Sequence, residues 1–425
     1  MSVGQTVKNT IKQGYKQTEV GIIPEGWEPT TMKKILIGDP QNGINVKLEN
    51  YGTGIPIFEI DALYNSEFTI NQSNLRLVAI EDENELKRYS LRENDLVINR
   101  VSKVKEGVGK MVLVVKPIQN LIYEGNIIRI KINDDLLIPR FLLFLSKTNL
   151  YLRYIQSTCK TTSLTSIDQG IIAKIPILIP PKEEQILIIQ ILENVNELIN
   201  HLSLLIEKKK NIKQGAMHEL LTGKQRLHNF HEKWKIQELR SIVRDFIVPM
   251  RNKPKTFSGQ IPWCRIEDFD GKYLISSKSG QHVDDKTVRG MNLRVYPTGT
   301  LLVSCSADLG RCAIVGRPLV SNQTFIGLVI DESVASNEFL YYYMTFKADE
   351  LNNLSSGTTI SYLSRDQFES FNTLIPPSKD EQVAIAEILS DMDSDINELE
   401  KRRDKYIMIK NGMMQKLLTG EIRLK

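Results

Sequence analysis

A repeat at an offset of 197 residues is the feature that most limits how this chain can fold. The segment 185–223 recurs in related form at 382–420, and each copy follows a Pro-Pro pair and ends in Leu-Leu-Thr-Gly. The matches extend to positions outside any apolar stripe, namely Asn200/Asn397, Lys208/Lys405, Lys213/Lys410, Gly215/Gly412, Arg226/Arg423 and Leu227/Leu424. The chain is therefore two versions of one unit, and we expect its function to be carried out twice, at two places a fixed distance apart.

Both copies carry the start and stop signals of one long helix. The prolines cannot extend a preceding helix, and the acidic residues that follow them favour the positive end of the helix dipole. In the second copy Ser378 and Glu381 have the spacing of a capping box. Gly223 and Gly420 supply the stops.

Apolar residues in both copies fall at alternating spacings of three and four, which is typical of a coiled-coil seam. Lys209 is the only polar residue at a seam position of the first copy, whose apolar positions are Ile188, Ile191, Val195, Leu198, Leu202, Leu205, Ile212 and Ala216. The second copy keeps Ile385, Ile388, Met392, Leu399, Tyr406, Ile409 and Met413. It places Asp395 and Arg402 at two other seam positions, so its seam is expected to be partly wet or locally shifted.

The length of these helices favours their pairing with each other. A helix of ~36 residues spans about 54 Å, too long to bury both flanks within one small domain. We expect the two copies to form an antiparallel coiled coil. The alternative is that each helix packs only on its own domain, although a narrow apolar stripe suits a helical partner better than a sheet.

The parts between the helices mix strand and helix patterns and repeat weakly. Matched features are Ile55–Leu63 with 261–269, Trp27 with Trp234, the buried strands 96–100 and 301–305, the short helices 139–152 and 337–348, and the Ser/Thr-rich loops 157–162 and 355–359. The predicted fold class is α+β. Two globular α/β domains are separated by two long helices, and the whole has a pseudo-two-fold internal repeat.

A short match suggests that the repeat is circular. Ile-Lys-Gln-Gly occurs at 11–14 and 212–215, and 409–412 is close to it. If the match is real, residues 11–14 take the place before the first domain that the end of the first helix takes before the second. The chain ends would then lie near one another.

Composition narrows the class of protein without defining a function. With 41% hydrophobic and 25% charged residues, the 425-residue chain is expected to be globular, and no apolar run approaches the ~20 residues of a membrane span. The polar N-terminus lacks the apolar core of a signal peptide, so we expect a cytoplasmic protein. A net charge of +4 and a pI near 8.6 permit nucleic-acid binding without demonstrating it. The four cysteines lack Cys-x-x-Cys spacing, so neither disulfides nor a zinc cluster is expected.

The order and duplication of these motifs resemble the specificity subunits of type I restriction-modification systems. The motifs that carry the resemblance are Leu178-Ile179-Pro180-Pro181 with Gln185, Leu374-Ile375-Pro376-Pro377 with Gln382, the opening phrase 21–27 and the terminal phrase 417–424. The resemblance covers nearly the whole chain. The second unit departs from it at 230–234, where the Ile-Pro phrase is missing.

The resemblance implies a non-catalytic DNA-reading subunit. In that family each variable domain recognises one half of a split sequence in double-stranded DNA, and the helices set the spacing between the halves. The helices and adjoining surfaces dock two methyltransferase subunits, and motor-nuclease subunits complete the enzyme. S-adenosylmethionine, ATP and magnesium are then expected in the partners, with no cofactor bound by this chain. The expected segments are an N-terminal segment 1–20, recognition domain 21–180, helix 181–224, recognition domain 225–376 and helix 377–425.

Motifs for chemistry are missing from the sequence. There is no Gly-x4-Gly-Lys-Ser/Thr loop, no Gly-x-Gly-x-x-Gly after a strand and no Asn/Asp-Pro-Pro-aromatic tetrapeptide. His228 and His231 stand three apart but lack further ligands, so we interpret them as exposed linker residues. We expect neither a catalytic nor a metal site.

DNA contacts are expected on polar loops that follow strands. Arg suits guanine, Asn and Gln suit adenine, and Lys or Arg on phosphates supplies affinity. The candidates in the first domain are Asn99, Arg100, Lys103, Lys105 and Lys110; those in the second are Ser306 and Arg311 in the equivalent loop 304–311, with Lys278, Gln281, His282, Lys286 and Arg289 earlier. The alternative for each is a solvated turn.

The charge runs 207–210 and 401–405 lie at equivalent places on the two helices. A solvated helix face is favoured there over a role in crossing the DNA backbone. For the whole chain, two other functions stay open: a protein-only coiled-coil scaffold that presents two protein-binding modules, and an enzyme fragment fused to a reader.

Overall fold

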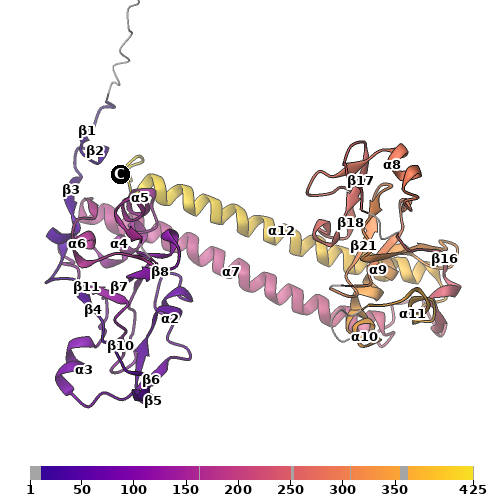
Figure 1. Ribbon diagram of the computed structural model, residues 1–425, viewed down its shortest axis with the longest axis horizontal. Coiled ribbons are helices and arrows are strands. Elements are labelled where there is room, and N and C mark those ends of the chain that lie inside the picture. The colour runs from indigo at the N-terminus through magenta and orange to yellow at the C-terminus, as the bar shows by residue number, and fades with distance from the viewer. Residues whose placement is uncertain (1–10, 162, 250–252, 307, 355–361, 425) are drawn as a thin grey trace, which may run out of the picture. The chain divides into compact units, whose positions relative to one another are not determined.

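The computed structural model describes residues 11–161, 163–249, 253–306, 308–354 and 362–424 (Figure 1). The chain divides into two compact units, Met1–His201 with Arg402–Lys425 and Leu202–Lys401. Two long helices, α7 (Lys182–Leu221) and α12 (Lys379–Leu417), each contribute one end to each unit. The two long helices predicted from the repeat are confirmed, with starts three residues earlier than the repeated segments.

The first unit is built around a four-stranded antiparallel sheet in the order β4-β11-β7-β9. Its strands are β4 (Gln41–Asn42), β11 (Ile127–Ile130), β7 (Leu96–Asn99) and β9 (Met111–Leu113). Every residue of β7, β9 and β11 is buried, which explains why they are apolar apart from Asn99 and Arg129. The predicted strand 96–100 is therefore confirmed.

Smaller sheets surround this centre in the orders β10-β5-β6, β12-β13-β8, β14-β3 and β1-β2. Their strands are β10 (Ile122–Tyr123), β5 (Tyr51–Phe58), β6 (Arg76–Val78), β12 (Lys160–Thr161), β13 (Thr165–Ser166), β8 (Val101–Ser102), β14 (Pro176–Ile179), β3 (Glu28–Thr31), β1 (Tyr15–Thr18) and β2 (Gly21–Pro24). The helices are α1 (Met32–Ile35), α2 (Ile60–Tyr64), α3 (Glu83–Tyr89), α4 (Pro139–Leu145), α5 (Asn149–Thr158) and α6 (Gln169–Ala173), with 3-10 turns at Leu48–Asn50 and Lys105–Gly107.

The second unit repeats this topology. Its main sheet has the order β16-β23-β20-β21-β18, and β19-β17-β22 matches β6-β5-β10. These strands are β16 (Val243–Ile247), β23 (Phe325–Ile330), β20 (Leu301–Ser304), β21 (Cys312–Val315), β18 (Tyr273–Leu274), β19 (His282–Val283), β17 (Ile261–Cys264) and β22 (Val320–Ser321), with β15 (Lys235–Glu238) pairing β24 (Asn372–Ile375). The helices are α8 (Asp285–Gly290), α9 (Asn337–Phe346), α10 (Ala348–Leu354) and α11 (Arg365–Glu369), with 3-10 turns at Leu239–Ser241 and Ile266–Asp268. The predicted α+β class and internal repeat are confirmed.

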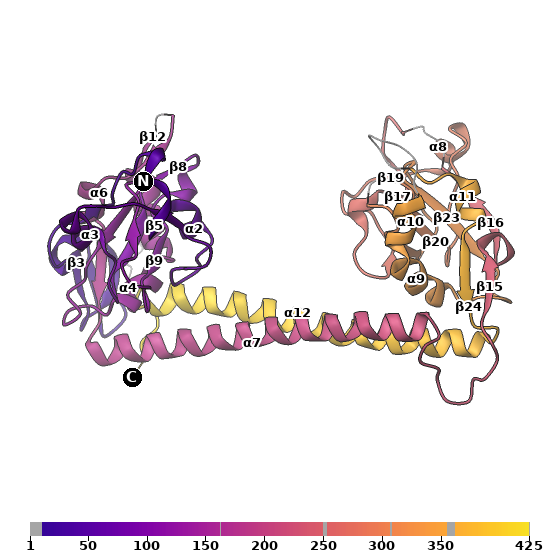
Figure 2. The same ribbon diagram turned by 90° about the horizontal axis from the view of Figure 1, so that it is seen from below.

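The short helices predicted at 139–152 and 337–348 each prove to be two helices, α4 with α5 and α9 with α10. Figure 2 shows α4 and α9 lying between the strands of their own unit and the long helices. One apolar cluster of the first unit joins α4, the start of α7 and the end of α12, and a second cluster joins α9 with the other ends. The long helices therefore pack on their own domains as well as on each other.

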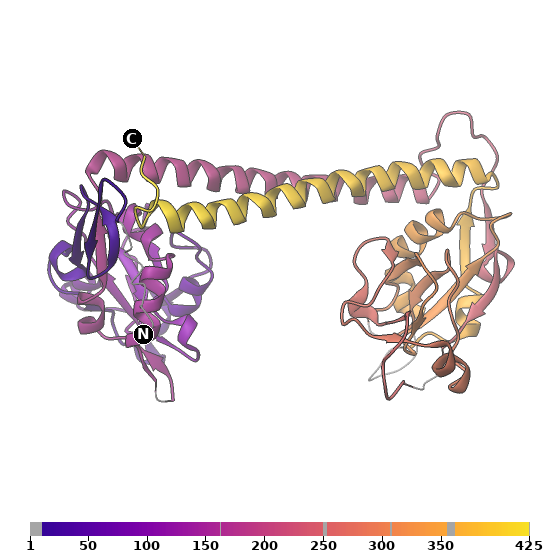
Figure 3. The same ribbon diagram turned by 90° about the horizontal axis from the view of Figure 1, so that it is seen from above.

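Within each unit the long helices run antiparallel, side by side (Figures 2 and 3). Their seam lies one residue away from the predicted register at every second position. Leu205 is 41% exposed where Ile206 is 3% exposed, and Ile396 is buried where Asp395 is exposed. Arg402 is also exposed, so the predicted wet seam is explained by a shifted register. Residues 205 and 206 are both apolar, so the sequence was compatible with two registers of the seam. A straight helix also drifts about 20° per heptad from a 3.5-residue repeat, which moves the buried face away from a strict heptad pattern.

Equivalent polar contacts hold the helices together in both units. Lys410 donates to Asn196 at 3.0 Å in the first unit, and Lys213 pairs with Asp393 at 2.5 Å in the second. The two pairs are equivalent to each other in the repeat, because 196 plus 197 is 393 and 213 plus 197 is 410. Lys209, the polar seam residue, pairs with Asp395 at 3.0 Å.

A buried carboxylate joins each domain to a helix start. Glu184 is 4% exposed and accepts two hydrogen bonds from Arg423, at 2.7 and 2.8 Å, and one from the Trp27 indole at 2.9 Å. Next to it, Gln185 accepts from the backbone N–H of Ile138 and donates to the Pro180 carbonyl. We call Glu184, Gln185, Trp27 and Arg423 the first clamp.

The second unit has the same arrangement. Glu381 is 1% exposed and accepts from Arg226 at 2.7 and 2.9 Å and from Trp234 at 3.3 Å. Gln382 accepts from the N–H of Ser336 and donates to Pro376. Glu381, Gln382, Trp234 and Arg226 are the second clamp. The predicted capping box is half formed: the Ser378 hydroxyl accepts from the Glu381 N–H at 3.4 Å, whereas the Glu381 carboxylate is used by the clamp.

The clamps also settle how the repeat closes on itself. The end of α7 and Arg226 lead into the second domain and bind its clamp. The end of α12 and Arg423 occupy the equivalent position against the first domain. Residues 11–14 do not take it, since they lie in a turn that leads into β1. Residues near the two ends of the described chain still meet, because the Tyr15 hydroxyl donates to the Glu421 carbonyl at 3.1 Å. The predicted closeness of the ends is confirmed for these residues, and the predicted segment 11–14 is wrong.

Candidate nucleic-acid interface

The loop after β7 is held from inside by Asn99. Its side chain is fully buried, its Nδ2 donates to the Gly107 carbonyl at 2.6 Å and to the Tyr64 hydroxyl at 3.1 Å, and its Oδ1 accepts from the N–H of Lys110. No capacity is left for a base edge. Asn99 is therefore removed from the candidate DNA contacts and assigned to holding the loop.

The second domain carries the same backbone frame. Gly109 donates to the Asn99 carbonyl at 3.1 Å, and Gly310 donates to the Ser304 carbonyl at 3.1 Å. Both loops also bind a distant segment in the same way. The N–H of Ile167 donates to the Arg100 carbonyl at 2.9 Å, and the N–H of Leu363 donates to the Cys305 carbonyl at 2.9 Å. Asn99 is thus equivalent to Ser304 and Arg100 to Cys305, as the sequence predicted for these strands.

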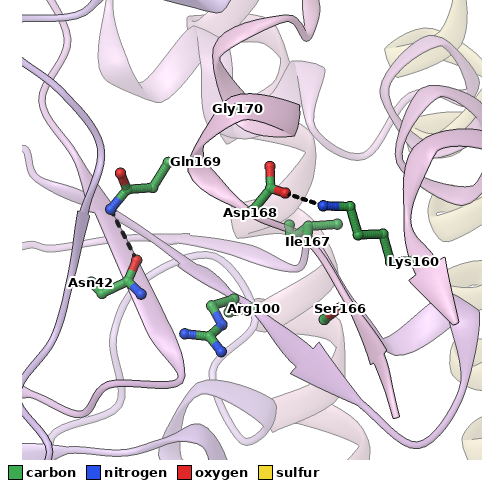
Figure 4. Close-up of a pocket in the computed structure, with 8 residues that line it drawn as sticks. All are labelled: Asn42, Arg100, Lys160, Ser166, Ile167, Asp168, Gln169 and Gly170. Carbon is green, nitrogen blue, oxygen red and sulfur yellow. Dashed lines mark hydrogen bonds and ion pairs between the residues drawn. The ribbon is translucent and has the colours of Figure 1, made fainter. Parts of the chain in front are cut away.

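Arg100 faces an open pocket of about 350 Å³ at the meeting point of β4, β12, β13 and the start of α6 (Figure 4). Asn42, Lys160, Ser166, Ile167, Asp168, Gln169 and Gly170 complete its lining. Lys160 pairs with Asp168 at 2.7 Å, and Gln169 donates to Asn42 at 3.2 Å. Among the residues that the structure describes, no carboxylate or hydrogen-bond acceptor engages the Arg100 guanidinium.

The other cations of this loop divide into two kinds. Lys103 and Lys105 are exposed, and no ion pair joins either one to any part of the chain that the structure describes. Lys110 is half-buried: its Nζ donates to the Tyr64 carbonyl at 2.8 Å, and burial lowers its pKa. Lys103 and Lys105 are thus the side chains best placed to meet phosphates.

The candidates of the second domain are dispersed. Arg311 donates to the Phe269 carbonyl at 3.0 Å and pairs with Asp308 at 3.7 Å, and Ser306 forms a backbone bridge with Tyr362. Exposed Lys278 pairs with Asp270, Gln281 accepts from Arg265, and His282 Nδ1 lies 2.9 Å from the Gly280 carbonyl. Lys286 and Arg289 are exposed on α8. Ala307 and the loop 355–359, which the sequence singled out, lie outside the described residues.

Sequence reasoning missed Asn42, Lys160 and Gln169. They are 58, 60 and 69 residues from Arg100 in the chain and reach it only because β4 joins the sheet edge and β13 pairs with β8. One signal was available, because Lys160 lies within the Ser/Thr-rich loop 157–162. The pairing of Thr165 with Ser102 then brings that stretch to the loop.

The two charge runs on the long helices are partly neutralised. Lys210 pairs with Glu400 at 2.6 Å and Arg403 with Asp404 at 2.8 Å, in addition to the pair formed by Lys209. These contacts support the solvated-face interpretation. His228 and His231 are exposed, and the described residues contain no group of three or more His, Cys, Asp or Glu side chains fit to hold a metal ion.

The cysteines are free thiols, three of them buried. Burial raises the pKa of Cys264, Cys305 and Cys312 to about 12, which makes their thiols inert at neutral pH. The fourth, Cys159, is half-buried. Across the part of the chain that the structure describes, no helix is long and apolar enough to span a bilayer.

Lys147 is a half-buried cation near Lys110 of the loop. Its Nζ donates to the Met111 carbonyl at 3.2 Å and lies 5.9 Å from the ring centre of Phe68, over which Lys410 also lies. Burial, together with the charges of Lys110 and Lys410, lowers the pKa of Lys147 to about 8, and Glu67 opposes this. Between pH 8 and the unfolded value of 10.5, the unfolded chain binds more protons, so the free energy of unfolding should rise with pH in this window.

Replacing Lys147 by Met should remove this pH dependence and raise the free energy of unfolding at pH 7 by at least about 1 kcal/mol. Urea unfolding at pH 7 and pH 9.5 measures both effects. Lys174→Met, at an exposed lysine of the same unit, is the control and should leave the pH dependence intact. Equal pH dependence in both variants would show that Lys147 keeps an ordinary pKa in the folded protein.

Comparison with known proteins assigns the chain to a family. The family described as type I restriction modification DNA specificity domain matches residues 24–214 and 231–408. The putative type I restriction enzyme MjaX specificity subunit of Methanocaldococcus jannaschii is 27% identical over 428 residues, covering 97% of this chain and 98% of the relative. The StySPI specificity subunit of Salmonella potsdam is 21% identical over 428 residues, covering 95% and 90%.

Solved structures show the same fold. A chain from a study of complex assembly and conformational transition of the type I R-M system has a TM-score of 0.63 at 16% identity, covering 94% of this chain and 99% of that one. The type I restriction-modification S subunit from M. genitalium has a TM-score of 0.55 at 15% identity, covering 92% and 96%. The chain therefore belongs to the type I restriction-modification DNA specificity family and is a specificity subunit, a DNA-recognition protein without catalytic activity of its own.

Proposed function

We propose that residues 21–180 and 225–376 each read one half of an interrupted, asymmetric sequence in double-stranded DNA. The observation that carries this proposal is that both domains share one backbone frame around the loop after the buried strand, while the side chains on it differ. Arg100 in the first domain is replaced by buried Cys305 in the second. A kept frame with changed side chains is what two readers of different bases require.

The long helices, 181–224 and 377–425, set the spacing between the two halves. Each domain is fixed to its helix by a buried clamp, so a reader cannot pivot freely on its spacer. The 40 residues of α7 correspond to about 60 Å of helix. A helix of that length is longer than the roughly 34 Å of one turn of duplex.

The helices also present apolar side chains to partners. Leu204 is 63% and Met408 69% exposed, and the repeat-equivalent Ile212 and Ile409 are both exposed. Apolar side chains that are exposed on a helix mark an interaction surface when they are grouped. Because Ile212 and Ile409 are equivalent in the repeat, they suit two partners of the same kind, which we take to be two methyltransferase subunits. Motor-nuclease subunits complete the enzyme. S-adenosylmethionine, ATP and magnesium are bound by the partner subunits. The assembly works in the cytoplasm.

Methylome sequencing of cells with and without this gene tests the proposal. The expected result is the loss of adenine methylation at one interrupted motif whose two halves differ. Cells that carry this gene but have an inactivated neighbouring methyltransferase gene provide the control. A continuous motif, or an unchanged methylome, would contradict the proposal.

A further inference from the structure

We propose that Arg100 and the amide pair of Asn42 and Gln169 determine the bases recognised in the half-site of the first domain, with Arg100 selecting a guanine and the amide pair an adenine. This inference rests on the proposed function and assigns its specificity to named side chains. Its main support is which charged and hydrogen-bonding groups of the pocket already have a partner and which do not.

The charges of the pocket leave one cation without a partner. The Lys160 ammonium is held by Asp168 at 2.7 Å, so that pair is neutral overall. Arg100 lies between Asn42 and Ser166, and its guanidinium has no acceptor among the described residues (Figure 4). Arg100 is also anchored, because its backbone N–H donates to Asn126 at 2.8 Å and its carbonyl accepts from Ile167. A fixed backbone and an unsatisfied planar fork of donors suit a bidentate contact with guanine O6 and N7.

The amide pair keeps both kinds of hydrogen-bonding capacity. Gln169 Nε2 donates to Asn42 Oδ1, so Gln169 Oε1 remains an acceptor and Asn42 Nδ2 remains a donor. Adenine presents a donor at N6 and an acceptor at N7 in the major groove, which matches one amide acceptor and one amide donor. The mutual hydrogen bond also restricts both side chains, which reduces the rotamer entropy lost on binding.

The second domain shows that these positions are free to vary. By the matched backbone bonds, Arg365 is the equivalent of Gln169, and each follows the N-cap residue of a short helix, Asp168 for α6 and Ser364 for α11. Arg365 is engaged, since its Nε donates to Glu369 at 2.5 Å. The frame is therefore shared while the pocket chemistry belongs to the first domain only. A residue needed for folding would be expected in both.

The test uses the complete locus, with this gene and its neighbours, and reads the methylated motif of each variant by methylome sequencing. Arg100→Lys keeps the charge but removes the fork, and should relax one guanine position of one half-site, with discrimination falling on the order of 10- to 100-fold. Gln169→Ala should relax an adenine position in the same half by a similar factor. The other half of the motif should be unchanged in both variants, which makes it an internal control for folding and assembly.

Lys103→Ala is the matched control for a cation in the same loop. It should lower methylation of all sites alike and leave the motif unchanged, because a phosphate contact carries no sequence information. If Arg100→Lys behaves like Lys103→Ala, with a weaker but unaltered motif, the inference is overturned while the proposed function stands. If the unaltered chain yields no interrupted motif, the proposed function itself fails.

Discussion

Replacing Glu184 by Ala should lower the free energy of unfolding by about 3–5 kcal/mol. The carboxylate is 4% exposed and holds three hydrogen bonds, two from Arg423 and one from Trp27. Its removal leaves the Arg423 guanidinium, whose side chain is 29% exposed, without its counter-charge and the indole N–H without an acceptor. Because Arg423 comes from the far end of the chain, the variant should also loosen the end of α12.

Urea unfolding followed by circular dichroism and tryptophan fluorescence measures this effect. Glu183→Ala is the matched control, since Glu183 is the exposed carboxylate one residue earlier in the same helical turn. Glu381→Ala should give a loss of similar size from the second unit. A loss below about 1 kcal/mol in Glu184→Ala would mean that the clamp is solvated like an ordinary surface pair.

Changing Arg100, Lys103 and Lys105 together to Ala should weaken DNA binding by more than tenfold near 0.1 M salt and flatten its salt dependence. Lys103 and Lys105 are the phosphate candidates, and each phosphate contact contributes about 0.9 to the slope of log K against log salt, so their loss reduces the slope by up to about 1.8. Fluorescence anisotropy with a labelled duplex across a salt series, using the assembled methyltransferase complex, gives both quantities.

The comparison variant removes the same number of charges from the helices. Lys208, Lys401 and Lys405 are exposed members of the charge runs, and no ion pair joins them to any described residue. Their replacement by Ala should change the slope by less than the loop variant does. An equal or larger change would show that the helices cross the DNA backbone, and unchanged affinity of the loop variant would remove that loop from the interface.

Much of the fold was predictable because it depends on local patterns and on duplication. The long helices, the buried strands β7 and β20 and the equivalence of Arg100 with Cys305 follow from periodicity and from the repeat. The register of the helical seam did not follow, because Leu205 and Ile206 are both apolar and only packing against α12 and the domain selects Ile206. Likewise, the pairing of Glu381 with Arg226 uses the carboxylate that the spacing with Ser378 assigned to a capping box, and only the bond from the Glu381 N–H to the Ser378 hydroxyl is formed.

The candidate site was predictable as a loop but not as a pocket. A buried strand that ends in a cationic, glycine-containing segment identified the loop of Arg100, Lys103 and Lys105. The same reasoning placed Asn99 on the surface, although its amide is consumed by the loop it supports. Side chains from distant segments, such as Gln169, reach Arg100 through sheet pairing, which no local pattern records.

By itself, the sequence determined that this protein is one unit made twice, with two long helices, unlike globular parts and no motif for chemistry. Those properties are written in periodicity and in repetition, which neighbouring residues carry without reference to the rest of the chain. Only the tertiary structure decided which polar residues are consumed in clamps and frames and which remain available to a ligand. Hydrogen bonds and burial are set by partners far away in the chain, and the same Asn or Glu is a surface group or a buried anchor according to what folds against it.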